Sequence, residues 1–179
     1  QIVTSSPVEK WADIMQGYVR ILLEARRYVY IETPYFLPTE TVMSAMRIAA
    51  LAGVDVRIMI PRHGDAKFVE WASRSYVFET IQAGVKVYLY RPGFLHSKLL
   101  VCDDIVCTCG STNVDFRSFE NNFEANAFIY DRETTLRFKQ IFMDDIKECN
   151  FVTERMISRK RPFAQRLWES VVRLLSPLL

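Results

Sequence analysis

The chain has few of the residues that build disulfide scaffolds and metal centres. Its 179 residues include 4 cysteines and 2 histidines, with no C-x-x-C pair and no histidine at zinc-finger spacing from a cysteine. We therefore expect buried, reduced thiols rather than a disulfide or a metal site at Cys102, Cys107, Cys109 and Cys149. A strong charge of one sign is also missing, because the net charge is only +2. Bulk charge thus gives little reason to expect a nucleic acid partner.

Long apolar runs are absent as well. None approaches the roughly 20 residues that a helix needs to cross a bilayer, and the first residues lack the basic and apolar regions of a signal peptide. The chain starts at Gln1 rather than Met, and residues 1–6 read like the middle of a longer polypeptide. Half of the residues are hydrophobic and a quarter are charged. This composition predicts a folded domain. The first residues suggest that the domain is a piece of a longer protein.

The first half of the chain alternates between helix and strand patterns. Pro7 after two serines marks a helix start, and apolar residues at helical spacing continue to residues 26–27. Thr39 can cap a second helix that ends at Gly53, and Asp65 can cap a third that Gly84 closes. The expected helices are 7–27, 39–52 and 66–83, and the expected strands are 28–33, 54–60 and 85–90. This alternation predicts parallel strands joined by crossover helices.

From Leu95 onwards the pattern changes. Strands over 97–102 and 105–109 are separated only by Asp103 and Asp104, which predicts an antiparallel hairpin. A further strand over 124–130 precedes a helix over 132–148. We therefore expect an α/β fold with a mixed sheet flanked by helices on both faces, over residues 1–152, followed by a basic amphipathic segment over 153–179.

One set of residues at fixed spacing indicates a functional site. It reads His96-x-Lys98-x4-Asp103-x6-Gly110-Ser111-x-Asn113. On a strand His96 and Lys98 would share a face, so an imidazole and an ammonium could meet one phosphate. Gly110 would allow a tight backbone, and Ser111 and Asn113 could donate hydrogen bonds to phosphate oxygens. The pattern predicts a phosphate-binding site.

A catalytic imidazole needs a group that fixes its tautomer, and a carboxylate usually does this. Glu124, at the start of the next expected strand, is the first candidate, and Asp103 is the second. A lone histidine in an apolar stretch is more often packed than catalytic, so the functional interpretation depends on the joint spacing. The other histidine, His63, follows a strand in a loop. We expect it at the surface, with a substrate contact as the alternative.

This spacing resembles the HKD motif of the phospholipase D superfamily. Three further segments, and the residues at the end of the chain, resemble bacterial cardiolipin synthases; they are 30–38, 92–98, 113–118 and 173–179. The likeness covers nearly the whole chain, as the C-terminal half of such an enzyme. It implies a phospholipase D-like half-domain, with no metal or other cofactor.

The resemblance implies a site built from two such motifs. One histidine attacks phosphorus to give a phosphohistidine, and the other, here His96, protonates the leaving alcohol and then deprotonates the incoming hydroxyl. Lys98 and Asn113 would hold the phosphate, Ser111 would support them, and Glu124 would orient His96. Asp103 belongs to the motif, but near the hairpin turn its role would be structural. With one motif here, either a missing N-terminal half or a second copy about a two-fold axis must supply the other histidine.

The basic residues around 159–161 lead into a segment with an apolar face, a basic face and Trp168. This pattern is typical of a helix on an anionic bilayer, or of a helix packed on its own domain. With the resemblance, it predicts peripheral contact with the cytoplasmic face of the cell membrane. The activity implied is phosphatidyl transfer between two phosphatidylglycerol molecules, giving cardiolipin and glycerol. The alternatives are a homodimeric phosphodiesterase or nuclease, and an inactive lipid-binding half.

Overall fold

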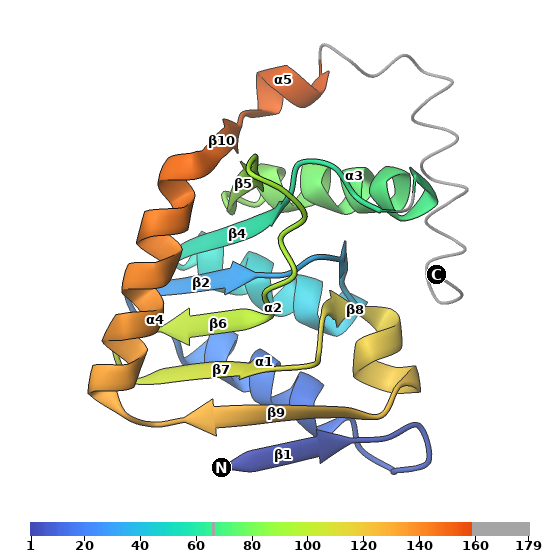
Figure 1. Ribbon diagram of the computed structural model, residues 1–179, viewed down its shortest axis with the longest axis vertical. Helices are drawn as coiled ribbons and strands as arrows, with labels where there is room; N and C mark the ends of the chain where they lie inside the picture. The colour runs from blue at the N-terminus through green and yellow to red at the C-terminus, as the bar shows by residue number, and fades with distance from the viewer. Residues whose placement is uncertain (66, 159–179) are drawn as a thin grey trace.

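A computed structural model describes residues 1–65 and 67–158 (Figure 1). Its main feature is a mixed sheet of eight strands in the order β1-β9-β7-β6-β2-β4-β5-β10. The strands are β1 (Ile2–Ser5), β2 (Tyr28–Glu32), β4 (Asp55–Pro61), β5 (Lys86–Tyr90), β6 (Leu99–Cys102), β7 (Val106–Gly110), β9 (Glu124–Ile129) and β10 (Cys149–Val152). A separate parallel pair joins β3 (Phe36–Leu37) to β8 (Val114–Asp115).

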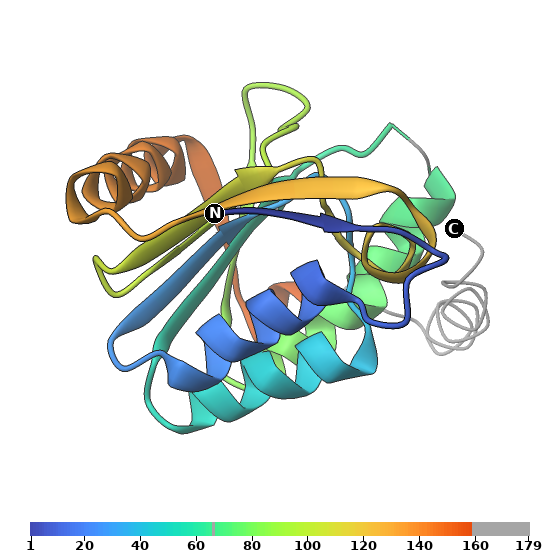
Figure 2. The ribbon, with the colours of Figure 1, turned by 90° about the horizontal axis from the view of Figure 1, so that it is seen from below.

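Helices cover both faces of this sheet (Figure 2). On one face lie α1 (Asp13–Glu24), α2 (Glu40–Leu51) and α3 (Lys67–Gln82), and on the other lies α4 (Arg132–Asp145). Short helical turns complete the order of elements: η1 (Arg117–Asn121), η2 (Ile146–Glu148) and α5 (Glu154–Ser158). The expected mixed α/β sheet with helices on both faces is confirmed.

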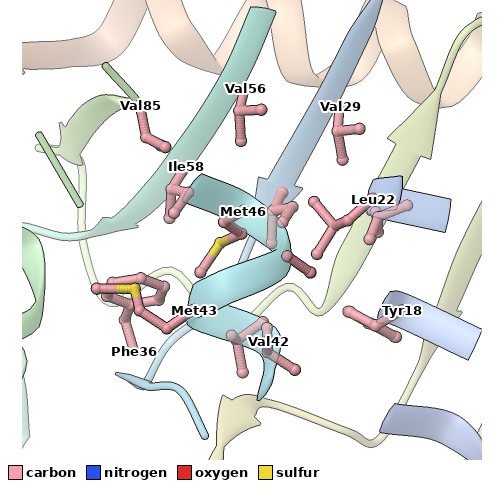
Figure 3. Close-up of a cluster of buried hydrophobic side chains, with 14 of the residues drawn as sticks. Tyr18, Leu22, Val29, Phe36, Val42, Met43, Met46, Val56, Ile58 and Val85 are labelled. Carbon is pink, nitrogen blue, oxygen red and sulfur yellow. The ribbon is translucent and has the colours of Figure 1, made fainter. Parts of the chain in front are cut away.

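The larger core lies between the sheet and the α1–α2 layer (Figure 3). Met43 and Met46 of α2 and Leu22 of α1 are completely buried there against Ile58 of β4. Burying each such side chain stabilises the fold by about 1.5–3 kcal/mol, before the entropic cost of ordering it. A smaller core of Tyr30, Met59 and Phe142 fills the space under α4. The central strands are thus buried on both faces, which gives the edge carrying the site a rigid support.

Several local expectations are confirmed. Thr39 caps α2 by accepting a hydrogen bond from the Val42 amide at 3.4 Å. Gly53 and Gly84 have φ of +91°, as a left-handed residue after a helix requires. β6 and β7 form the expected antiparallel hairpin, with Asp103 and Asp104 at φ of 53° and 60°. The helix, strand and hairpin signals in residues 28–148 therefore give the order of the long elements correctly, but they missed the short strands β3 and β8 and the turn η1.

Three expectations need correction at the ends of the chain. The first helix begins at Asp13, not at Pro7, and Trp11 is 59% exposed. The residues before it include strand β1, which the sequence analysis missed and which pairs antiparallel with β9. Strand β10 was also missed; it follows η2 and pairs antiparallel with β5. Both are four-residue edge strands held by long-range pairing, which local periodicity does not report.

Candidate active site

The motif residues other than Asp103 gather at one edge of the sheet, where the central strands end. This edge is formed by the segment before β6, the end of β7, the β3–β8 pair and the start of β9 (Figure 1). The Thr33 hydroxyl accepts a hydrogen bond from the Val114 amide at 3.0 Å, and so ties β8 to the end of β2. His96 and Lys98 lie just before β6, which begins at Leu99 rather than at the expected Ser97. The two residues are therefore extensions of a central strand.

Lys98 is the half-buried cation of this edge. Its ammonium donates a hydrogen bond of 3.0 Å to the backbone carbonyl oxygen of His96. Burial lowers the pKa of Lys98, while the nearby carboxylates of Glu124 and Asp115 oppose that shift. The ammonium is thus close enough to both carboxylates to feel their charge. It is a positive group held in a fixed direction, as binding of a phosphate anion requires.

Glu124 and Ser111 form a pair across the β7–β9 ladder. The Ser111 hydroxyl donates to one oxygen of the Glu124 carboxylate, and the side-chain amide of Asn122 donates to the other at 3.2 Å. Ser111 also accepts from the Ala125 amide at 3.0 Å. Among the residues that the structure describes, no hydrogen bond joins Glu124 to the exposed His96 ring. The orienting role of Glu124 and the phosphate-binding role of Ser111 therefore stay predictions.

Asn113 directly precedes β8, and its side chain bonds to the turn that follows β8. Its side-chain amide donates to the Ser118 hydroxyl at 3.2 Å and also bonds to Asp115. Its carbonyl oxygen is buried without a partner in the described part of the chain. Asp115 accepts the Ser118 amide at 2.6 Å, and burial raises its pKa. The amide that was expected to hold phosphate is thus fixed by two neighbours.

Gly110 has a steric role at this edge. A Cβ at this position would collide with the carbonyl oxygen of Ala125 and the side chain of Asn126 on the adjoining strand β9. The close approach of β9, rather than a left-handed backbone, explains the glycine. Gly110 therefore sets the spacing of the β7–β9 pair, and hence the distance between Ser111 and Glu124. Its predicted contact with substrate stays a prediction.

Asp103 does not lie with the other motif residues, and its catalytic role stays a prediction. It lies at the turn beyond the far end of β6, and the four residues of that strand alone span about 13 Å. Its carboxylate accepts the backbone amides of Arg26, Arg27 and Tyr28 at 2.6, 2.9 and 2.8 Å. Asp103 joins the β6–β7 turn to the start of β2, which is a structural role.

The sequence analysis missed three residues around the site. Asp115 was quoted within the segment 113–118 but received no role, although its spacing from Asn113 was available. Phe94 and Tyr35 form a strip of rings beside the imidazole: the Phe94 ring lies 5.8 Å from the His96 ring and 6.1 Å from the Tyr35 ring. Phe94 is 40% exposed, so this strip offers an apolar surface next to a reactive ring.

Other expectations can be placed on the structure. The four cysteines are free thiols, but only Cys102 and Cys107 are buried as expected, whereas Cys109 and Cys149 are half-buried. His63 is exposed in the loop after β4. Within residues 1–65 and 67–158, no group of three His, Cys, Asp or Glu side chains could hold a metal ion, and no helix has the length and apolarity to span a bilayer. The basic segment from 159 to 179 lies outside the described residues.

Taken together, this edge presents an imidazole, an ammonium, a carboxamide and two carboxylates. An ammonium and a carboxamide can bind the oxygens of a phosphate, and an imidazole can give or accept a proton near neutral pH. Developing charge on phosphate oxygens is stabilised by such fixed donors. The arrangement therefore suits proton transfer at a phosphoester, with the imidazole of His96 at this edge.

Comparison with known sequences agrees with this arrangement. Residues 18–146 match the family described as cardiolipin synthase, PLD-like domain, where PLD stands for phospholipase D. A cardiolipin synthase of Clostridium perfringens (strain SM101, type A) is 45% identical over 179 residues, which is 100% of this chain and 37% of that protein. The major cardiolipin synthase ClsA of Bacillus subtilis (strain 168) is 44% identical over 180 residues, with the same shares covered. The chain thus spans 37% of the length of these relatives.

Solved structures share the fold at lower identity. Nuc of Salmonella typhimurium, a phospholipase D family member, aligns with a TM-score of 0.71 and 18% identity, over 85% of this chain and 97% of that one. A phosphatidylserine synthase of Haemophilus influenzae Rd KW20 aligns with a TM-score of 0.77 and 17% identity, over 100% of this chain and 47% of that one. The same fold therefore fills nearly all of one chain and about half of another.

Proposed function

The chain belongs to the family of cardiolipin synthase PLD-like domains, and from this premise we propose that it supplies one half of a phosphatidyl-transfer site. The reaction moves a phosphatidyl group from one phosphatidylglycerol to the hydroxyl of another, and gives cardiolipin and glycerol. The observation that carries the proposal is the position of Lys98, whose ammonium bonds to the His96 carbonyl oxygen within electrostatic reach of the Glu124 and Asp115 carboxylates. A phosphodiester anion would bind this ammonium.

The proposed roles follow from the chemistry of each group. A histidine of the other half forms a bond to phosphorus while the bond from phosphorus to the glycerol oxygen breaks, and His96 gives its ring proton to that oxygen. In the second step His96 takes the proton of the incoming hydroxyl, whose oxygen replaces the histidine on phosphorus. Lys98 and Asn113 bind the non-bridging oxygens throughout.

In this proposal Glu124 orients His96 once substrate is bound. The Glu124 carboxylate would have to exchange one of its bonds with Ser111 or Asn122 for the imidazole. Ser111 would then be free to donate to phosphate. The substitution Glu124→Gln tests this role, because it removes the negative charge that stabilises an imidazolium. A normal turnover rate and pH profile in this variant would reject the role.

The second half of the site must come from outside this copy. Two histidines that act on opposite sides of one phosphorus cannot both be His96 of a single chain. A second PLD-like half in the same polypeptide is the first interpretation, supported by relatives of which this chain covers 37%. We propose phosphatidylglycerol and an anionic membrane surface as partners, with peripheral attachment at the cytoplasmic face. The segment 153–179 would contribute to that contact through its basic residues.

A homodimeric phosphodiesterase or nuclease is the second candidate. Its support is the alignment with Nuc, in which this fold makes up 97% of the solved chain and so needs no second half in the same polypeptide. Two copies would place two His96 rings about a two-fold axis. An inactive half that only binds lipid is the third candidate. Turnover of any phosphodiester by the chain alone would exclude it.

Product analysis separates these candidates. Phosphatidylglycerol vesicles are incubated with this chain alone, or with the chain joined to a second PLD-like half, and the lipids are analysed. The proposal predicts cardiolipin from the joined protein only. Phosphatidic acid or cleaved phosphodiesters from the short chain alone would contradict it and support the homodimer.

A further inference from the structure

The imidazole of His96 lies against the ring of Phe94. The centroids of the two rings are 5.8 Å apart, and their planes make an angle of 33°. This separation is within the range of favourable ring pairs. In the described part of the chain, no hydrogen bond reaches the imidazole, and the bond from Lys98 ends on the backbone carbonyl oxygen of His96. The ring of Phe94 is therefore the neighbour that can limit rotation of the imidazole.

The backbone under these two rings is fixed from both sides. Leu95, which lies between them in the sequence, is buried in the smaller core. On the other side, the Lys98 ammonium holds the carbonyl oxygen of His96 at 3.0 Å. The position of the His96 backbone is thus set, and the freedom that remains is rotation about the side-chain bonds. Phe94 acts on that rotation.

Tyr35 supports Phe94 on its other side. The centroids of these two rings are 6.1 Å apart, with 53° between the planes. The Tyr35 hydroxyl donates a hydrogen bond of 2.6 Å to the Asp65 carboxylate. Burial and Asp65 raise the pKa of Tyr35 to about 12, so the hydroxyl keeps its proton near neutral pH. Three connections, β2–β3, β4–α3 and β5–β6, thus meet in one row of side chains that ends at His96.

Core packing does not explain the place of Phe94. Its side chain is 40% exposed, whereas three other phenylalanines of the chain are at most 1% exposed: Phe36, Phe119 and Phe142. A ring that stays this exposed gains only part of the free energy that full burial would give. The contacts that the structure shows for the Phe94 ring are those with His96 and Tyr35.

We propose that Phe94 is a positioning residue that keeps the His96 imidazole in the orientation needed for proton transfer, and that Tyr35, anchored by Asp65, keeps Phe94 in place. A general acid must direct its N–H at the leaving oxygen, and a ring that rotates freely spends only part of its time in that orientation. The effect on turnover rests on the proposed function, whereas the restraint on the ring does not.

The restraint can be measured in the chain without substrate. NMR relaxation of the ¹³C-labelled ring carbons of His96 reports the mobility of the imidazole. We expect higher mobility in Phe94→Leu and wild-type mobility in Phe94→Tyr, which keeps the ring. Phe151→Leu is the matched control, because it removes a 48% exposed ring that lies 5.2 Å from the Tyr88 ring on strands β10 and β5. Equal His96 mobility in the wild type and Phe94→Leu would overturn the proposal.

Two changes at Tyr35 test the support of Phe94. Tyr35→Leu removes the ring, and Tyr35→Phe keeps the ring but removes the bond to Asp65. We expect the mobility of the His96 imidazole to rise in both, and more in Tyr35→Leu. Wild-type mobility in Tyr35→Leu would overturn the part assigned to Tyr35.

Kinetics in an active assembly test the link to turnover. Phe94→Leu should lower kcat by about two- to tenfold, as loss of one ring pair would, with KM unchanged. Phe94→Tyr should restore kcat, and Phe151→Leu should match the wild type. A wild-type kcat in Phe94→Leu, with a mobile imidazole, would overturn the catalytic part of the proposal. Absence of cardiolipin from the wild-type assembly would instead count against the proposed function, and the NMR result would still decide the restraint.

Discussion

The ammonium of Lys98 donates a hydrogen bond of 3.0 Å to the carbonyl oxygen of His96, two residues earlier. The side chain therefore bends back along its own segment, and this fixes the charge at the backbone of His96. The same ammonium lies within electrostatic reach of Glu124 and Asp115, which come from the start of β9 and from β8. Two carboxylates from later segments of the chain thus act on one cation.

We expect Lys98→Ala to lower kcat/KM by about a hundredfold or more in an assembled enzyme, because a fixed charge on the phosphate is lost. The matched control is Lys147→Ala, which removes an exposed lysine from η2 that pairs with Asp144. Steady-state kinetics on phosphatidylglycerol vesicles check both variants. Burial lowers the pKa of Lys98, so its ammonium loses its charge at a lower pH than an exposed lysine does. The activity of the wild type should therefore decline at that lower pH. A normal rate for Lys98→Ala would exclude its role.

Asp103→Ala should reduce stability and leave the chemistry intact. Three backbone amides, those of Arg26, Arg27 and Tyr28, lose their acceptor, and we expect the free energy of unfolding to fall by about 3 kcal/mol. Urea denaturation measures this change. The kcat of the folded fraction should stay within a few-fold of the wild type. A hundredfold lower kcat at unchanged stability would support the catalytic interpretation of Asp103.

Gly110→Ala should be strongly destabilising, because its Cβ would meet the backbone of β9 at Ala125 and Asn126. Overpacking of this kind costs about 1–3 kcal/mol or more when backbone has to move. Gly93→Ala is the control, since a Cβ there meets no atom within 4 Å. Chemical denaturation of both variants gives the comparison. Equal stability of the two would show that β9 does not require a glycine at 110.

Glu32→Gln should change how stability depends on pH. The unfolded carboxyl loses its proton near its ordinary pKa of 4.5, whereas in the native state burial raises the pKa to about 7. The native state therefore binds more protons between these values, and stability falls as the pH rises through this range. The difference corresponds to roughly 3 kcal/mol of stability, lost from the wild type between pH 4 and pH 8. In Glu32→Gln this loss should be absent from unfolding curves recorded across that range.

How much of this could be read from the sequence depends on how local each signal is. Thr39 followed by an apolar helix pattern, and two aspartates between two strands, specify α2 and the β6–β7 hairpin within a few residues. Strand β1 left no such signal, because its pairing partner β9 lies more than 100 residues away. The helix start at Pro7 was wrong for the same reason, since the chain first has to leave that strand.

The motif located the candidate site, but its spacing did not predict which of its residues lie together. Asp103 is part of the same spacing as His96, and only the direction of β6 shows that the two lie at opposite ends of a strand. Glu32 could not be found from sequence, because a glutamate within a strand usually faces solvent. It lies on the face of β2 that also carries Tyr28 and Tyr30, which α4 covers. Long-range packing, rather than local pattern, decides these roles.

The most direct test of the central claim compares the two histidines of the chain. In a protein that joins this chain to a second PLD-like half, cardiolipin formed from phosphatidylglycerol vesicles is measured for His96→Ala and for the exposed control His63→Ala. We predict at least about a hundredfold less cardiolipin from His96→Ala, because a general acid is lost, and a normal yield from His63→Ala. Equal yields from the two variants would contradict the assignment of His96 as the proton donor of the site.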